Sequence, residues 1–222
     1  MNFSDLAVWE PKFEEGKPFT MLIPSSRGTG KTTLFKYLFR EHFQGLFDFF
    51  IFFSETLDDD DCFTDLCPDS EGMCFNKFNQ TKLDIVFEHQ NNFRKKFNRY
   101  ANVLIVFDDV TNLKTNKIID AIFSRGRHKK FSIVLAVQSA TQHISTTQKT
   151  NADVFIVFRQ KSTATHRTLI ENVLGDHLPN HLNKAEKISF LNTLPNFNAI
   201  VVDNLNTDLP ADKRIFRFKA PL

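Results

Sequence analysis

Residues 19–38 read FTMLIPSSRGTGKTTLFKYL, which is an apolar run, a loop of small residues and an amphipathic segment. The apolar run predicts a buried β-strand, and the amphipathic segment predicts a helix because its apolar residues recur at helical spacing. Between them, Gly30, Lys31 and Thr32 meet the G-x-x-x-x-G-K-[ST] pattern of a phosphate-binding P-loop. Ser25 stands where that pattern has its first glycine. The order strand, loop, helix indicates a nucleotide-binding site.

A P-loop binds phosphate through backbone N–H groups and the N-terminus of the following helix. In this role Lys31 would reach the terminal phosphates and Thr32 would hold magnesium. Gly28 supplies extra flexibility beside Ser25. The expected nucleotide-binding residues are Ser26, Arg27, Gly28, Thr29, Gly30, Lys31, Thr32 and Thr33.

Strand-like and helix-like segments alternate along the rest of the chain, which predicts an α/β fold with a mainly parallel central sheet and helices on both faces. We expect one domain over 1–222, with a core at about 17–160, an irregular acidic insertion at about 54–80 and a C-terminal extension at about 161–222. The strands are expected at 19–23, 47–53, 103–107, 132–137, 153–158, 199–203 and 215–218. The helices are expected at 31–42, 83–100, 116–123, 163–174 and 182–191.

The composition is that of a globular protein, with 222 residues and 41% hydrophobic residues. The formal net charge of +2 gives no global field that would attract nucleic acid. No apolar run approaches a membrane span, and the first residues lack the basic flank and apolar stretch of a signal peptide. We therefore expect an intracellular protein with no membrane partner.

The segment 54–80 contains the acidic run Asp58–Asp61 and the cysteines Cys62, Cys67 and Cys74. An odd number of cysteines in a reducing compartment argues against a disulfide framework. A zinc site with His89 as fourth ligand is the alternative, but the paired C-x-x-C spacing of common structural sites is missing. Free thiols and a solvated acidic loop are the expected outcome.

A bound magnesium nucleotide needs a carboxylate at the C-terminal end of a buried strand, and Asp108 ends the apolar run at 103–107. Asp109 follows and could polarise the attacking water, a role often taken by the longer Glu. A strand that simply leaves through a polar Asp-Asp turn is the plain alternative.

Gln138 ends the next buried strand and could touch the γ-phosphate or the attacking water if that strand lies between the other two. Arg125 and Arg127 precede that strand on a basic turn. Either could act as an arginine finger across a subunit interface, contact a nucleic-acid backbone, or complement a helix dipole.

Taken together, these motifs resemble the FtsK/HerA-like ATPases, and most closely the viral DNA-packaging ATPases of poxviruses, other large DNA viruses, virophages and polinton-like elements. The resemblance covers about 21–158. It is carried by Arg27–Leu34, by Val103–Asp109, and by Ser124–His128 leading through Ile133–Leu135 to Gln138.

That resemblance implies a RecA-like P-loop NTPase fold with the Gln138 strand between the two Walker strands. It implies a homo-oligomeric ring that moves double-stranded DNA into a capsid. The expected locations are virus assembly sites in the host cytoplasm or nucleus, with the virion as an alternative, and capsid proteins are candidate further partners. By likeness Lys31 and Thr32 bind Mg-ATP, Asp108 holds Mg²⁺ and Asp109 takes the catalytic-carboxylate position. Gln138 senses the γ-phosphate, and Arg127 is the favoured finger.

Three other interpretations stay open at this point. A small-molecule kinase fits the length, but the sequence shows no Arg-rich lid. A GTPase would need Asn-Lys-x-Asp, which the sequence at Asn116–Ile119 misses. A nucleotide-binding scaffold without turnover is the third.

Overall fold

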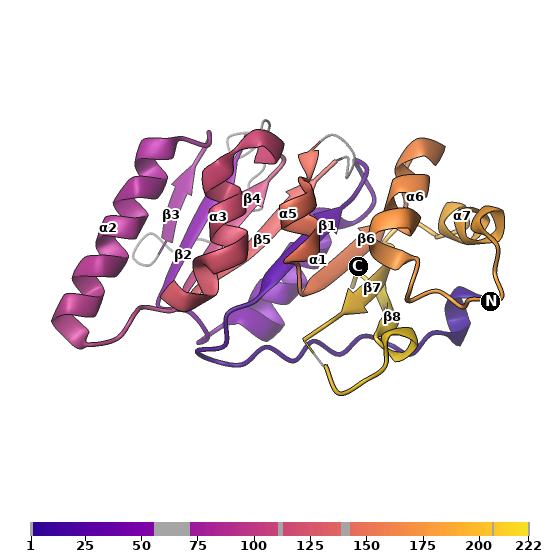
Figure 1. The fold of residues 1–222 in the computed structure, drawn as a ribbon, viewed down its shortest axis with the longest axis horizontal. Coiled ribbons are helices and arrows are strands. Elements are labelled where there is room, and N and C mark those ends of the chain that lie inside the picture. Colours follow the sequence, from indigo (N-terminus) through magenta and orange to yellow (C-terminus); the bar gives the residue numbers. More distant parts are fainter. Residues whose placement is uncertain (1, 56–71, 111–112, 139–142, 206, 222) are drawn as a thin grey trace.

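The computed structural model describes residues 2–55, 72–110, 113–138, 143–205 and 207–221. Its centre is an eight-stranded sheet in the order β3-β2-β4-β5-β1-β6-β7-β8. The first six strands in this order pair in parallel, whereas β6–β7 and β7–β8 pair antiparallel. Figure 1 shows the strands side by side across the molecule, with helices in front of and behind them. The predicted α/β class and mainly parallel sheet are confirmed.

The strands are β1 (Thr20–Pro24), β2 (Phe49–Ser54), β3 (Gly72–Phe75), β4 (Val103–Asp108), β5 (Phe131–Val137), β6 (Val154–Phe158), β7 (Asn198–Asp203) and β8 (Ile215–Lys219). The helices are α1 (Lys31–Leu38), α2 (Gln80–Phe97), α3 (Lys117–Arg125), α5 (Thr146–Thr150), α6 (Thr163–Leu169) and α7 (Lys184–Asn192). Short π-helical segments extend α1 over Phe39–Phe43 and α6 over Ile170–Leu174.

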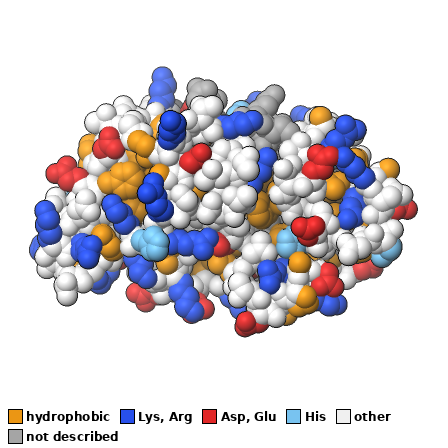
Figure 2. All heavy atoms as spheres, in the orientation of Figure 1, with side chains coloured by type: hydrophobic (Ala, Val, Ile, Leu, Met, Phe, Trp, Pro, Cys, Tyr) orange, Lys and Arg blue, Asp and Glu red, His pale blue; other side chains and the backbone are white. Residues whose placement is uncertain are grey.

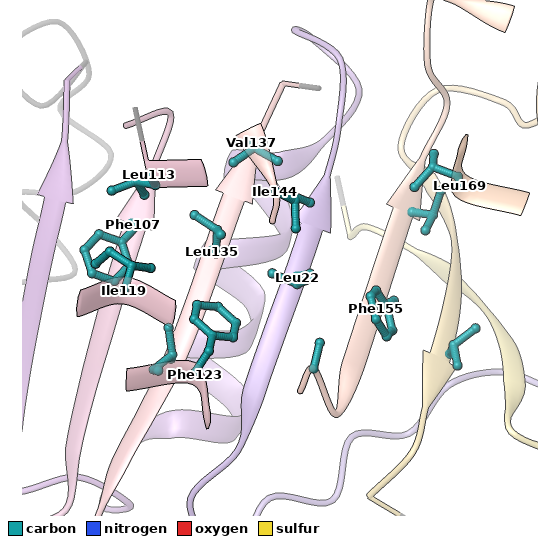
Figure 3. Packing of buried hydrophobic residues seen from close by; sticks show 14 of the residues in the cluster. Leu22, Phe107, Leu113, Ile119, Phe123, Leu135, Val137, Ile144, Phe155 and Leu169 are labelled. Atoms are coloured by element: carbon teal, nitrogen blue, oxygen red, sulfur yellow. The ribbon is translucent and has the colours of Figure 1, made fainter. Parts of the chain in front are cut away.

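Alternating side chains along the strands divide the core into two layers. Along β5, Leu135 belongs to the layer under α3, while Val134 and Ala136 belong to the layer over α1. Figure 3 shows the first layer, where Phe123 of α3 packs over the sheet. Because the central strands are covered on both faces, they form the continuous apolar runs seen in the sequence.

One segment differs from its prediction. Within 54–80, the stretch Gly72–Phe75 is a β-strand that pairs in parallel with β2, and α2 already begins at Gln80. Four residues with a glycine and a cysteine carry almost no strand signal of their own. The strand is made by pairing with the β2 edge, a tertiary effect that overrides local propensity.

The C-terminal part of the chain extends the same sheet, because β7 pairs with β6 in a register from Val154–Asp203 to Phe158–Ala199. The N-terminal segment runs beside β8, where Val8 forms a parallel bridge with Arg217. The Trp9 indole Nε1 donates to Asp203 Oδ2, at the end of β7, at 2.9 Å. The part of the sheet beyond β1 is therefore formed by the C-terminal strands, and the N-terminal segment runs along its last strand.

Candidate nucleotide-binding site

The P-loop lies between the end of β1 and the start of α1. Gly30 is the residue before the helix, with φ 114°, and its carbonyl accepts from Leu34 N at 2.9 Å. Gly28 also has a positive φ, 78°, which glycine adopts without steric cost. The Thr29 hydroxyl donates to Ser26 O at 2.7 Å within the loop. The first N–H groups of α1 have no partner inside the helix, which makes this end suited to phosphate.

Ser25 occupies the position of the missing glycine without strain. Among the residues that the structure describes, the non-glycine residues with positive φ are Asn98, Asp109, Lys130 and Phe197, so Ser25 is not in the left-handed region. Its backbone N–H donates to Val137 O at 2.9 Å and continues the ladder with β5. Glycine is therefore not required there.

Phe197, in the turn before β7, packs against the P-loop. A Cβ added at Gly30 would lie 3.0 Å from Phe197 Cδ1 and 3.1 Å from Phe197 Cα. Phe197 N donates to Thr29 O at 2.9 Å. Gly30 is needed both for its φ and for this close approach. Sequence reasoning missed Phe197, because one Phe among the 26 in this sequence gives no signal.

Two carboxylates and the P-loop lysine meet at the end of β4. Lys31 Nζ lies 2.9 Å from Asp108 Oδ1 and 2.5 Å from Asp109 Oδ2. Asp108 is 3% exposed, and Ser54 at the end of β2 donates to its Oδ2 at 3.4 Å. Burial raises the pKa of Asp108, an effect that the nearby Lys31 ammonium opposes and Asp109 reinforces. Lys31 thus neutralises a carboxylate pair that would otherwise repel.

Asp109 adopts a left-handed backbone conformation with φ 50°. Its N–H donates to Ala136 O at 3.0 Å, so the chain turns sharply just after the last ladder position of β4. Asn and Asp are several-fold enriched in this region compared with other non-glycine residues. The backbone thereby gives a physical reason for Asp where Glu is common.

Gln138 follows β5, which lies between β4 and β1 as the resemblance implied. The side chain is exposed, and its Nε2 donates to Asp109 Oδ2 at 3.3 Å. The structure therefore brings Lys31, Asp108, Asp109 and Gln138 together where the parallel strands end. We call this side of the sheet the P-loop edge, and the side where the same strands begin the opposite edge.

Arg127 lies at the opposite edge, in the 3-10 turn Gly126–Lys129 that leads into the start of β5. Its guanidinium donates to Asp153 Oδ1 at 2.7 Å. Asp153 also accepts from the Thr20 N–H at 2.7 Å, just before β6. Arg127 and its neighbour Arg125 are thus placed away from the P-loop of their own chain.

The oxygen atoms at the P-loop edge suit a hard cation such as Mg²⁺, which prefers carboxylate and hydroxyl ligands. Asp109 Oδ1 is buried and makes no hydrogen bond within the described residues, and the partner of Asp108 Oδ1 there is the Lys31 ammonium, 2.9 Å away. Thr32, on the first turn of α1, is half-buried. The residues present therefore fit the expected magnesium site.

The residues of the alternative zinc site lie only partly within the described part of the chain. Cys62, Cys67 and the acidic run Asp58–Asp61 lie outside the described residues, while Cys74 is half-buried in β3. The described residues contain no cluster of three or more His, Cys, Asp or Glu side chains able to hold a metal. Within the same residues, no helix is long and apolar enough to cross a membrane.

Basic side chains do not gather into one field on the face shown in Figure 2, where Lys and Arg are spread among Asp and Glu. This agrees with the formal net charge of +2. The surface view alone therefore does not mark a nucleic-acid contact.

Comparison with known proteins connects this site to a family. The sequence model of the family described as "Poxvirus A32 protein" matches residues 12–190. No curated protein matches the chain in sequence.

Among solved structures, the genome packaging NTPase B204 of Sulfolobus turreted icosahedral virus 2, in complex with AMP, is similar in fold. Its TM-score is 0.67 at 15% identity, covering 94% of this chain and 100% of that one. B204 of Sulfolobus turreted icosahedral virus, described as a DNA-packaging ATPase, has a TM-score of 0.63 at 14% identity, covering 93% and 100%. The cytoplasmic domain of the Thermomonospora curvata type VII secretion ATPase EccC has a TM-score of 0.56 at 14% identity, covering 99% of this chain and 32% of that one.

Proposed function

This chain belongs to the poxvirus A32 protein family, and from that membership we propose that it is an ATP-hydrolysing motor that packages double-stranded DNA into a viral capsid. The fold likeness to genome packaging NTPases supports the proposal. The observation that carries it is the cluster at the P-loop edge, where Lys31 Nζ contacts both Asp108 and Asp109.

In the proposed reaction, Lys31 leaves the carboxylates for the terminal phosphates of ATP. Thr32 and Asp108 would hold Mg²⁺, which would neutralise phosphate charge. Asp109, released from Lys31, accepts a proton from the attacking water. The water oxygen bonds to the γ-phosphorus while the bond to the β–γ bridging oxygen breaks, giving ADP and phosphate.

Gln138 is proposed to connect hydrolysis with movement. Its hydrogen bond to Asp109 Oδ2 puts the amide beside the proposed base. A change at the γ-phosphate would reach Asp109 and Gln138 together, and β5 leads from there to the edge that carries Arg127. Gln138 is therefore the proposed sensor.

The remaining parts of the proposal rest on the family and not on a contact in one chain. They are a homo-oligomeric ring, Arg127 as finger, capsid proteins as partners and action at intracellular assembly sites. The kinase interpretation has no supporting observation of comparable weight in the described residues.

The test is ATP turnover with and without double-stranded DNA, measured beside the oligomeric state. The wild type should hydrolyse ATP faster with DNA, and Lys31→Ala should lose turnover by about 10²-fold or more, because charge stabilisation at the phosphates is lost. A wild type that phosphorylates nucleoside monophosphates and ignores DNA would show that the motor proposal is wrong.

A further inference from the structure

Gln160, at the junction of β6 and α6, is almost fully buried beside the P-loop. It is 4% exposed, and its Nε2 donates to Pro24 O and to Phe158 O, both at 3.0 Å. Pro24 is the last residue of β1 and directly precedes the P-loop. The amide therefore connects the ends of two neighbouring strands at the point where the phosphate loop begins.

The Gln160 side chain connects β1 and β6 beyond the point where their backbone pairing ends. The pairing between β1 and β6 covers Met21 with Val154 and Leu22 with Phe155, although both strands continue further. On its other side, β1 pairs with β5 up to Pro24, and Ser25 N continues that ladder. The loop entry is thus held by main-chain bonds from β5 and by a side-chain amide from the β6 end.

His166 holds Gln160 in turn. The backbone N–H of Gln160 donates to His166 Nε2 at 3.2 Å, and His166 is fully buried on α6. Burial and the positive charge of Arg159 lower the pKa of His166, which keeps the ring neutral and its Nε2 an acceptor. The adjacent Lys161 N–H donates to Ser26 Oγ at 3.1 Å. Two successive residues of the junction thus contact the P-loop segment.

We propose that Gln160, whose backbone is held by His166, is a positioning residue that sets the P-loop entry for binding of a nucleoside triphosphate. P-loop N–H groups bind phosphate only if they are held within a fraction of an ångström. Losing the amide leaves Pro24 O buried without its partner and frees the loop entry on the β6 side. Affinity for ATP should fall, while the chemical groups Lys31, Asp108 and Asp109 stay in place.

A second buried glutamine provides a matched control. Gln90 of α2 is 2% exposed, and its Nε2 also donates to two carbonyls, Ala101 O and Lys129 O. These carbonyls precede β4 and β5, so Gln90 performs the same local task at the opposite edge of the sheet. Gln160→Met removes two donated bonds with little change of volume. Gln90→Met removes two such bonds and also the bond that Gln90 Oε1 accepts from Ala101 N, so it is the more disruptive change for stability.

The experiment measures the ATP dissociation constant, and KM with kcat, for wild type, Gln160→Met and Gln90→Met, beside their thermal unfolding. We expect Gln160→Met to raise Kd and KM by roughly tenfold, which corresponds to the net free energy of about one hydrogen bond. The kcat should stay within about threefold of wild type. Gln90→Met should lose stability and keep the wild-type Kd. Equal Kd values for Gln160→Met and wild type, or equal shifts in both variants, would overturn the proposal.

His166 supplies a second, milder pair of variants if Gln160→Met does not fold. His166→Gln retains an acceptor near the Nε2 position, and His166→Leu does not. ATP affinity should be largely kept in His166→Gln and lowered in His166→Leu, whereas equal affinities would contradict the positioning role. The inference rests on the proposed nucleotide site, but binding needs no turnover. A wild type that binds ATP without hydrolysing it would therefore overturn the motor proposal and leave this one standing.

Discussion

The two edges of the central sheet treat their buried polar groups differently. At the edge where the strands begin, Asp153 accepts from Thr20 and Arg127, and Gln90 binds two carbonyls and the Ala101 N–H. At the edge where the strands end, several buried atoms make no hydrogen bond within the described residues. They are Ser25 Oγ, Asp109 Oδ1 and His166 Nδ1, while Lys31 Nζ and Asp108 Oδ1 are held only by ion pairs.

This difference separates stability from function. Satisfied buried groups rigidify a structure, while an unused buried donor or acceptor costs free energy of folding. All of the buried side-chain atoms left without a hydrogen bond in the described part of the chain lie at the P-loop edge. Lys31, Asp108 and Asp109 can exchange their ion pairs for contacts with a ligand, whereas His166 Nδ1 is fully buried and cannot. The edge where the strands begin therefore stabilises the fold, and the other edge is organised for binding.

The largest effect is expected where Arg127, at the edge where the strands begin, would contact the P-loop edge of a neighbouring subunit. If Arg127 is a finger, Arg127→Ala should reduce turnover by about 10³-fold or more, because a transition-state charge contact is lost. Arg127 must first leave Asp153, and a half-exposed ion pair of this kind is worth only about 0–1 kcal/mol. ATP turnover of the purified ring is the measurement, and mixing Arg127→Ala with Lys31→Ala subunits should restore part of it.

Arg125→Ala is the matched control for the finger, since Arg125 is the last residue of α3, directly before the turn that carries Arg127. It should keep most of the turnover. Verified mixed rings that recover nothing, or an Arg127→Ala ring that loses only thermal stability, would leave Arg127 as a structural partner of Asp153.

The next effect compares one carboxylate from each edge. Asp109→Asn keeps a residue that tolerates φ 50° but removes the proposed base, so turnover should fall by about 10²–10⁴-fold with ATP affinity retained. Asp153→Asn should lower the free energy of unfolding by about 1–3 kcal/mol and leave turnover unchanged. Single-turnover kinetics and urea unfolding of both variants test this, and a stability loss in Asp109→Asn as large as in Asp153→Asn would contradict the division between the edges.

A smaller effect separates backbone freedom from packing inside the P-loop. Gly28→Ala meets nothing within 4 Å and should cost only the left-handed backbone penalty of about 1–2 kcal/mol. Gly30→Ala adds a contact at 3.0 Å with Phe197 and should cost at least about 1 kcal/mol more. Urea denaturation without nucleotide measures both, and equal losses would show that Phe197 yields without cost.

The sequence predicts the parts of the fold in which local pattern and burial agree. The runs at 103–107 and 132–137 are apolar throughout because both faces of β4 and β5 are covered, and the P-loop pattern is local in the chain. From these, the gathering of Lys31, Asp108, Asp109 and Gln138 follows once β5 lies between β4 and β1.

Other features depend on contacts between distant segments and leave no local signal. β3 exists because β2 offers an edge, and Ser54 contacts Asp108 only through the register of β2 with β4. Phe197 and Gln160 reach the P-loop from parts of the chain in which the sequence shows no motif. The resemblance favours Arg127 as a finger, which stays a prediction, and its ion pair with Asp153 leaves no local signal in the sequence.

The smallest effects are pH dependences, and they distinguish the edges by their pH windows. Asp48, beside the start of β2, has a lowered pKa because of the Arg99 guanidinium, with a further contribution from the Asn102 N–H. A carboxyl group with a lowered pKa in the folded state stabilises the fold fully above its unfolded pKa of about 3.9. This stabilisation is lost as the pH falls through the folded pKa. The stability difference between wild type and Asp48→Asn should therefore be constant from pH 7 to 5 and shrink only below about pH 4.

His166 behaves differently, because burial lowers its pKa and the unfolded chain takes up the proton first. The wild type should lose stability relative to His166→Gln as pH falls below about 6.5, the unfolded value, and the loss should end at the folded pKa. Urea unfolding at intervals from pH 7 to 5 measures this. A flat difference there would mean that the buried ring accepts a proton without cost, and the neutral His166 that holds Gln160 would lose its physical basis.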